Sequence, residues 1–253
     1  MKTLLSFRAL VLSALLVMVA ITERSLAEEG SVVIDKAIKA VGGESKLAKL
    51  KSVSLKTKTQ LRFGNKEANF FGDCSAFESD KLLSIGEADG VATRLVLAPL
   101  GCWAKFGEQV EEARSDALPA VRKMLFALRA SQILLPLKDK EVTLSPGWDG
   151  EVGDRPALLV KATHKDHGDL LFYFDKQTGL LAKVESRTKL SIDQLERVIE
   201  FRFSEYKDFD GLKCFTKINV SGDLEFGEKL NSEITLSDIK AETKLEDNLF
   251  SKP

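Results

Sequence analysis

The spacing of apolar residues changes along this chain, and the change predicts where helices give way to strands. Apolar residues recur every three to four positions from Ser31 to Val41, which predicts a helix that Gly42-Gly43 ends. Residues 44–50 (ESKLAKL) predict a second short helix. From Val53 to Phe63 the spacing becomes two, which is typical of a strand with one face in water.

A series of strands is expected to follow, broken by one long helix. Gly64-Asn65 predicts a turn into a partner strand, and further short strands are expected over residues 67–77, 81–86, 93–98 and 102–106. From Asp116 to Leu135 a broad apolar stripe predicts the amphipathic helix, with Ser115 as its cap. Pro119 is tolerated in the first turn, and Pro136 is expected to end the helix.

The remainder of the chain predicts antiparallel sheet. The expected strands are residues 141–144, 155–164, 169–175, 180–187, 195–206, 212–221 and 229–239, followed by a helical turn near 245–250. Turns are expected at residues 147–150, 176–179 and 208–211, each rich in Gly or Asp. Consecutive strands joined by tight turns indicate a meander. The segment HGDLLFYFDKQTGLLAKVESR (167–187) is interpreted as one hairpin of it.

The number of strands predicts the fold class. About ten twisted strands do not form a flat sheet, so the chain is expected to be an α+β protein with a curved antiparallel sheet, open as a half-barrel. Helices are expected to cover its concave mouth as a lid. Such an arrangement encloses an apolar cavity.

The N-terminus has the features of a signal peptide. Lys2 and Arg8 precede an apolar run, residues 9–21, which is shorter than the roughly 20 residues of a membrane span. Ser25-Leu26-Ala27 offers a cleavage site, so residues 1–27 are interpreted as a cleavable signal and residues 28–253 as a single domain. The alternative is an uncleaved anchor. We see no second apolar stretch long enough to span a bilayer.

Charge and cysteine content narrow the function classes. The full chain has 37 basic residues (Lys and Arg) and 38 acidic residues (Asp and Glu). Without residues 1–27, which contain three basic residues and one acidic residue, 34 basic and 37 acidic residues remain, and the formal charge is −3. This balance argues against nucleic acid as a partner. Export permits disulfides, but Cys74, Cys102 and Cys214 fit either one bridge with a free thiol or three buried thiols.

Catalytic and metal-binding patterns are not evident in the sequence. The only histidines, His164 and His167, fall in an expected hairpin turn, where a solvated role is favoured over metal binding or nucleophilic catalysis. There is no GxSxG elbow and no glycine-rich phosphate loop. Glu111-Glu112 and Asp208/Asp210 are interpreted as solvated surface. We therefore expect no cofactor, no metal and no enzymatic activity.

Large apolar residues on the strands and the long helix are the candidate binding residues. Each of them is either ordinary core or part of a lipid-sized pocket between sheet and helix, and periodicity does not separate the two. The candidates are Phe63, Phe70, Leu97, Trp103, Leu125, Leu128, Phe201 and Phe203.

The arrangement as a whole resembles a known family. The helix VIDKAIKAVGGESKLAKLKSV, the Gly-Cys-Trp strand, and the segments YFDKQTGLL (173–181) and YKDFDGLKCFTKI (206–218) are similar to the LolA/LolB-like superfamily of exported lipoprotein-sorting proteins. The resemblance covers nearly all of residues 28–253 and implies an incomplete antiparallel barrel lidded by helices. Cys214 stands where the family usually has proline, and no arginine here matches the carrier's functional one.

The resemblance implies a periplasmic, non-enzymatic carrier of lipid or lipoprotein acyl chains. An envelope sensor with a filled core and a protein partner is the alternative, and a hydrolase that uses the His164/His167 loop is a more remote one. Peripheral contact with a membrane stays open as well.

Overall fold

The computed structural model describes most of the chain beyond the N-terminal segment. The described residues are 30–50, 52–78, 81–98, 101–113, 115–189, 195–223, 228–242 and 246–253. The predicted signal segment, residues 1–27, lies outside them. Within these ranges, none of the helices combines the length and the apolarity needed to cross a bilayer.

The helices lie close to where the apolar spacing predicts them. Residues 30–40 are helical, α2 spans Glu44–Leu47, and α3 spans Leu118–Ile133 with Pro119 in its first turn. The predicted cap is wrong: Ala117 precedes α3, without a side-chain hydrogen bond to the helix. At the other end α3 stops before Pro136, because Leu134 adopts a left-handed conformation (φ 56°). Pro136 lies in the 3-10 turn that follows, Leu135–Lys138.

Fourteen strands form one antiparallel sheet. Their bounds are β1 Ser52–Phe63, β2 Lys66–Glu78, β3 Lys81–Ala88, β4 Val91–Ala98, β5 Gly101–Phe106, β6 Gln109–Glu112, β7 Val142–Leu144, β8 Trp148–Val152, β9 Arg155–His164, β10 Gly168–Asp175, β11 Leu181–Thr188, β12 Arg197–Phe209, β13 Leu212–Asp223 and β14 Lys229–Glu242. The final turn is 3-10 helical, Asp247–Phe250. Apart from β6 and β8, each strand was expected from the alternation of apolar and polar residues.

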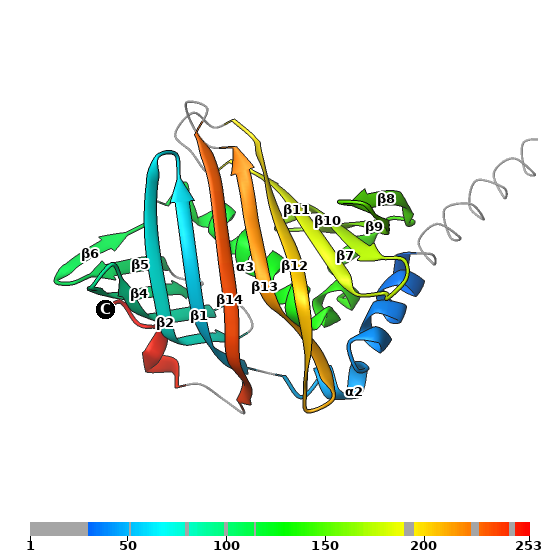
Figure 1. The fold of residues 1–253 in the computed structure, drawn as a ribbon, viewed down its shortest axis with the longest axis horizontal. Helices are drawn as coiled ribbons and strands as arrows, with labels where there is room; N and C mark the ends of the chain where they lie inside the picture. Colours follow the sequence, from blue (N-terminus) through cyan, green and yellow to red (C-terminus); the bar gives the residue numbers. More distant parts are fainter. Residues whose placement is uncertain are drawn as a thin grey trace, which may run out of the picture.

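Two meanders meet at the first and last strands. Strands β1 to β6 pair in sequence order, β9 to β14 do the same, and β1 pairs with β14 to join the halves (Figure 1). One edge of the sheet is therefore β6, and the other is formed by β7 and β8, which pair with different parts of β9, so the sheet is curved but not closed. The segment that contains α3 must pass from one edge to the other, and α3 lies behind the central strands in this view.

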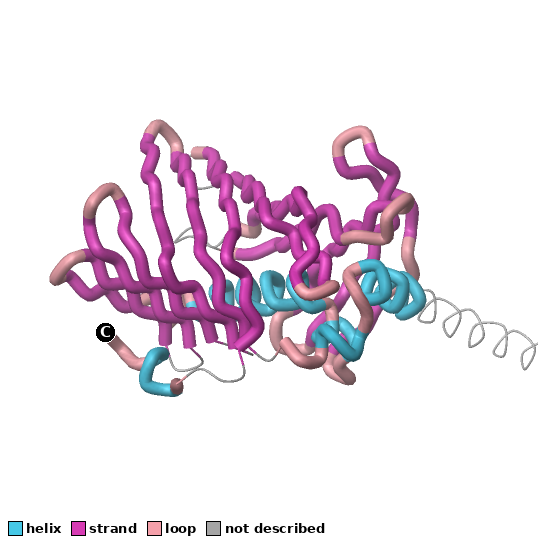
Figure 2. The backbone as a smooth tube through the Cα atoms, turned by 60° about the horizontal axis from the view of Figure 1, so that its bottom comes forward, coloured by secondary structure: helices cyan, strands magenta, loops and turns pink. Residues whose placement is uncertain are grey.

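The main core lies between the inner face of the sheet and the helices. Strand residues such as Phe172, Val184 and Phe203 are buried there with Ile34 of the helix at residues 30–40 and Ala130 of α3. In Figure 2, α3, α2 and the helix at residues 30–40 lie on this side of the curved sheet, whereas the final 3-10 turn packs on the other face. A smaller cluster, formed by Leu83, Val96 and Phe250 with Trp103 packed against it, is separate from this core.

One predicted turn is wrong. Residues 147–150 were expected to connect strands, but Trp148–Val152 forms β8 and pairs with β9 from Trp148↔Leu159 to Val152↔Arg155. The reversal takes place instead at Gly153-Asp154, where Gly153 has φ 60°.

A mostly buried ionic cluster lies on the outer face of β10, β11 and β12. The ammonium of Lys183, whose side chain is 9% exposed, is 2.5 Å from Glu185 Oε1 and 3.8 Å from Glu200 Oε1. It also lies 3.9 Å from the centre of the Tyr173 ring, and the Tyr173 hydroxyl donates a hydrogen bond to Glu185 (2.8 Å). Burial is the main cause that raises the pKa of Tyr173, and the hydrogen bond to Glu185 raises it further, so the hydroxyl keeps its proton.

The hairpin at residues 167–187 is confirmed as a structural turn. β10 and β11 pair from Leu170↔Ser186 to Phe174↔Leu181, and the Asp175 carboxylate organises the connection. It accepts hydrogen bonds from the N–H groups of Gln177 (3.1 Å) and Thr178 (2.8 Å) and from the Thr178 hydroxyl (2.9 Å). Gly179 completes the return at φ 72°.

Replacing Asp175 with alanine is expected to lower the free energy of unfolding by about 2 kcal/mol, because the N–H groups of Gln177 and Thr178 and the Thr178 hydroxyl lose their shared acceptor. Burial alone raises the pKa of Asp175, but the bonds from Thr178 and the charge of Arg155 lower it overall. A lowered carboxyl pKa stabilises the fold above the unfolded value of about 3.9, and this contribution is lost as pH falls below it. Urea denaturation of D175A at pH 7 and pH 3 measures both effects. Asp149→Ala, at an exposed ion pair with Lys176, is the control and should change stability by less than about 0.5 kcal/mol.

Candidate functional site

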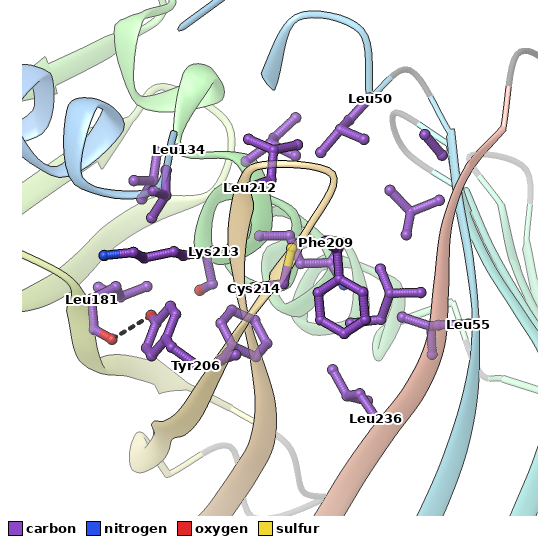
Figure 3. Close-up of a pocket in the computed structure, with 18 of the residues that line it drawn as sticks. Leu50, Leu55, Leu134, Leu181, Tyr206, Phe209, Leu212, Lys213, Cys214 and Leu236 are labelled. Atoms are coloured by element: carbon purple, nitrogen blue, oxygen red, sulfur yellow. Dashed lines mark hydrogen bonds between the residues drawn. The ribbon is translucent and has the colours of Figure 1, made fainter. Parts of the chain in front are cut away.

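An apolar pocket lies where the end of α3, the β12–β13 hairpin and the β1–β14 seam meet (Figure 3). Ser131, Gln132, Ile133 and Leu134 of the α3 end contribute to it. The other lining residues are Val41, Leu50, Val53, Leu55, Leu181, Tyr206, Phe209, Asp210, Leu212, Lys213, Cys214, Phe215, Leu236, Ile239 and Ala241. Segments from nearly the whole length of the chain therefore meet at one site.

The glycine pair after the first helix fixes one wall of this pocket. Gly42 has φ 125°, and a side chain there would come within 2.5 Å of the Gly211 carbonyl oxygen. The close approach lets the Lys213 N–H donate to the Val41 carbonyl (2.8 Å). The β12–β13 hairpin is thereby held against the helix at residues 30–40. The sequence signal for this contact, Gly42-Gly43, was interpreted only as a helix stop.

The polar groups inside the pocket are neutral. The Tyr206 hydroxyl donates to the Leu181 carbonyl (2.7 Å), as the dashed line in Figure 3 shows. Burial raises the pKa of Tyr206, and the neighbouring Cys214 adds a smaller rise. The Cys214 thiol forms no disulfide, and its pKa is raised mainly by burial and further by the charge of Asp208. A protonated thiol is a poor nucleophile, so Cys214 contributes an apolar contact to the site.

The space inside the pocket is narrow. About 90 Å³ is open to the centre of a water-sized sphere, and one water needs roughly 10–15 Å³ on that measure. The exposed lining residues, Asp210, Lys213 and Ala241, mark its mouth. The pocket therefore has room for only a short apolar segment, and its mouth is polar.

The apolar wall continues beyond the pocket along the inner face of the sheet. Residues paired across neighbouring strands share a face. One inner row runs through Phe203, Ile218, Ile234, Thr59, Phe70, Ala88 and Val91. Val91 is 46% exposed, as is Phe106, which pairs with Thr93 on the same face. Leu95, two residues beyond Thr93 on the same face, is 36% exposed. An open apolar surface thus extends over β2 to β5.

The predicted binding residues are spread over the inner face, the core, α3 and the outer face. None of those whose side chains the structure describes lines the pocket. Phe70 and Leu97 lie on the open inner face, while Phe201 and Phe203 are buried in the main core. Leu125 is buried on α3, and Leu128 packs on the main core. Trp103 pairs with Val96 on the outer face, and the Phe63 side chain lies outside the described part. Their contact with a ligand stays a prediction.

The histidine loop is a turn, but the expected solvated role is wrong for His164. Its side chain is 10% exposed and lies between His167 and Phe126 of α3. Across the described ranges, no three His, Cys, Asp or Glu side chains gather in a way that would hold a metal ion.

A larger hollow on the outer face has a different character. About 580 Å³ is open there between polar side chains of β1, β12, β13 and β14. Its two arginines are each paired, Arg62 with Glu67 (2.8 Å) and Arg202 with Glu200 (2.9 Å). The hollow is therefore a solvated groove of the twisted sheet, and the apolar pocket is the better candidate site.

Comparison with known proteins identifies the fold. Neither a protein-family model nor a curated protein sequence matches this chain. Among solved structures, a LolA superfamily protein from Nitrosomonas europaea is similar, with a TM-score of 0.56 and 13% identity over 88% of this chain and 98% of that one. A DUF1329 family protein from Desulfovibrio piger is similar with a TM-score of 0.51 and 14% identity, over 88% and 97%. The chain therefore has a LolA-like fold, as its sequence resemblance implied.

Proposed function

We propose that this protein is a periplasmic, non-enzymatic carrier that binds a lipid or the acyl chains of a lipoprotein. The observation that supports it is the apolar pocket between α3, the β12–β13 hairpin and the β1–β14 seam, continued by the exposed inner face of β2 to β5. Both surfaces are uncharged over most of their area, and the charged residues Lys213 and Asp210 lie at the mouth.

The proposed ligand is longer than the pocket. Burial of a methylene contributes roughly 0.8 kcal/mol, so a few methylenes in the pocket anchor one end of a chain. The remainder lies along the inner face toward Leu95 and Phe106, whose exposure would otherwise be unfavourable. α3 acts as the lid, because its end lines the pocket and moving it widens the space.

Native mass spectrometry of the protein purified without detergent tests this function. A bound species with the mass of a lipid, released by solvent extraction, is expected. Titration of the delipidated protein with a fluorescent fatty acid should then give saturable one-to-one binding. If no lipid co-purifies and the fatty acid does not bind, the carrier function is wrong. The alternative, a sensor with a protein partner, would then be favoured.

A further inference from the structure

The two histidines of the chain form a ring stack with α3. The His164 and His167 ring centroids are 4.4 Å apart, and the Phe126 ring of α3 lies 4.7 Å from the first and 5.1 Å from the second. His164 is the last residue of β9, and His167 lies in the turn that leads to β10. The stack therefore joins the middle of α3 to one particular turn of the sheet.

Hydrogen bonding fixes the orientation of the His164 ring in this stack. Its Nδ1 accepts a hydrogen bond from the Asp166 backbone N–H (3.1 Å). Its Nε2 faces Glu141 Oε2 at 3.9 Å, but Glu141 already binds Lys165, 2.5 Å from its other oxygen.

The charges around His167 oppose its protonation. Arg122 and Lys123 face it from α3, His164 faces it from β9, and only Asp166 of its own turn is acidic. Burial of the ring is the main cause that lowers the pKa of His167 below its usual value, and the neighbouring His164 lowers it further. Since the docked conformation favours the neutral imidazole, docking is strongest above about pH 6.5 and weakens as pH falls below it.

The stack is linked to the pocket through α3. Phe126 lies seven residues before Ile133, about 10 Å along the helix, and Ser131 to Leu134 line the pocket. Lys123, one turn before the stack, donates to the Arg187 carbonyl on β11 (2.7 Å). We propose that Phe126, His164 and His167 form a proton-sensitive latch, which holds α3 on the sheet while the His167 imidazole is neutral and releases it when His167 is protonated. The consequence for ligand exchange rests on the proposed function, but the latch itself does not.

Hydrogen–deuterium exchange of the ligand-free protein tests the latch. After correction for the intrinsic pH dependence of amide exchange, α3 peptides should exchange about tenfold faster at pH 5 than at pH 8, because protonation of His167 weakens the docking of α3. Peptides from β13 and β14 should not change. Equal acceleration of all peptides would indicate global acid unfolding and overturn the proposal, as would unchanged exchange of α3.

Three variants separate the latch from ordinary packing. His167→Phe keeps an aromatic ring but cannot be protonated, so its α3 exchange should be slow at both pH values. Phe126→Ala removes the ring on α3, so exchange should be fast at both. Lys176→Gln, in the next hairpin turn, should behave like the wild type. A full pH response in H167F would contradict the proposal. If the fatty acid never binds but α3 exchange follows pH as expected, the carrier function fails and the latch stands.

Discussion

Replacing Ile239 with tryptophan is expected to weaken binding of a fluorescent fatty acid about tenfold. Ile239 is half-buried and lines the pocket from β14. The larger indole fills part of a space of only about 90 Å³. If it displaces two methylenes of the ligand, the loss is about 1.6 kcal/mol, which corresponds to roughly a tenfold change in Kd. Fluorescence titration of the delipidated variant measures this change.

A matched substitution controls for the added ring. Ile85 lies on the outer face of β3 and is 37% exposed, so Ile85→Trp adds the same side chain far from the inner face. This variant should bind the fatty acid as the wild type does. Equal affinity of I239W and the wild type would place the ligand elsewhere. Thermal unfolding of both variants separates a blocked pocket from a destabilised fold.

Replacing Lys183 with methionine is expected to lower the free energy of unfolding by about 3 kcal/mol. The ammonium compensates the Glu185 carboxylate, whose side chain is only 15% exposed. Without the ammonium, Arg202 still pairs with Glu200 (2.9 Å), but Glu185 loses its cation in a poorly hydrated site. Removing one partner of a buried ion pair costs about 3–5 kcal/mol. Urea denaturation at pH 7 gives the value.

The double variant Lys183→Met/Glu185→Leu shows where that loss originates. The double variant also removes the Glu185 carboxylate, which K183M leaves without its cation. It should therefore recover at least half of the stability that K183M loses. Lys217→Met is the control, because its partners Glu205 and Glu233 are exposed, and a much smaller loss of stability than in K183M is expected. If K183M and K217M lose equal stability, the buried cluster contributes no more than a surface ion pair.

The local elements of this fold could be predicted because their signals are local. Alternation of apolar and polar residues placed β1, and the apolar stripe placed α3 to within two residues at each end. The hairpin around Asp175 was predictable because a tight return needs short-range hydrogen bonds and a glycine. β8 was missed because Gly147 and Gly150 gave a turn signal that pairing with β9 overrides.

The candidate site could not be predicted, because long-range contacts form it. Val53 of β1 and Ala241 of β14 are neighbours only because the first strand pairs with the last. Nothing in either strand alone specifies that partner. Phe203 and Cys214 have similar apolar patterns in the sequence, yet the first is core and the second lines the pocket. The burial of His164 likewise depends on where α3 crosses the sheet.

The sequence by itself therefore determined the strands, the helices and, through its family resemblance, the LolA-like fold, because periodicity and turn residues act over a few positions. The tertiary structure alone decided which apolar residues face a pocket, which face the core, and which stay exposed along the inner face. Those outcomes depend on the β1–β14 pairing and on the path of α3, which bring together residues nearly two hundred positions apart.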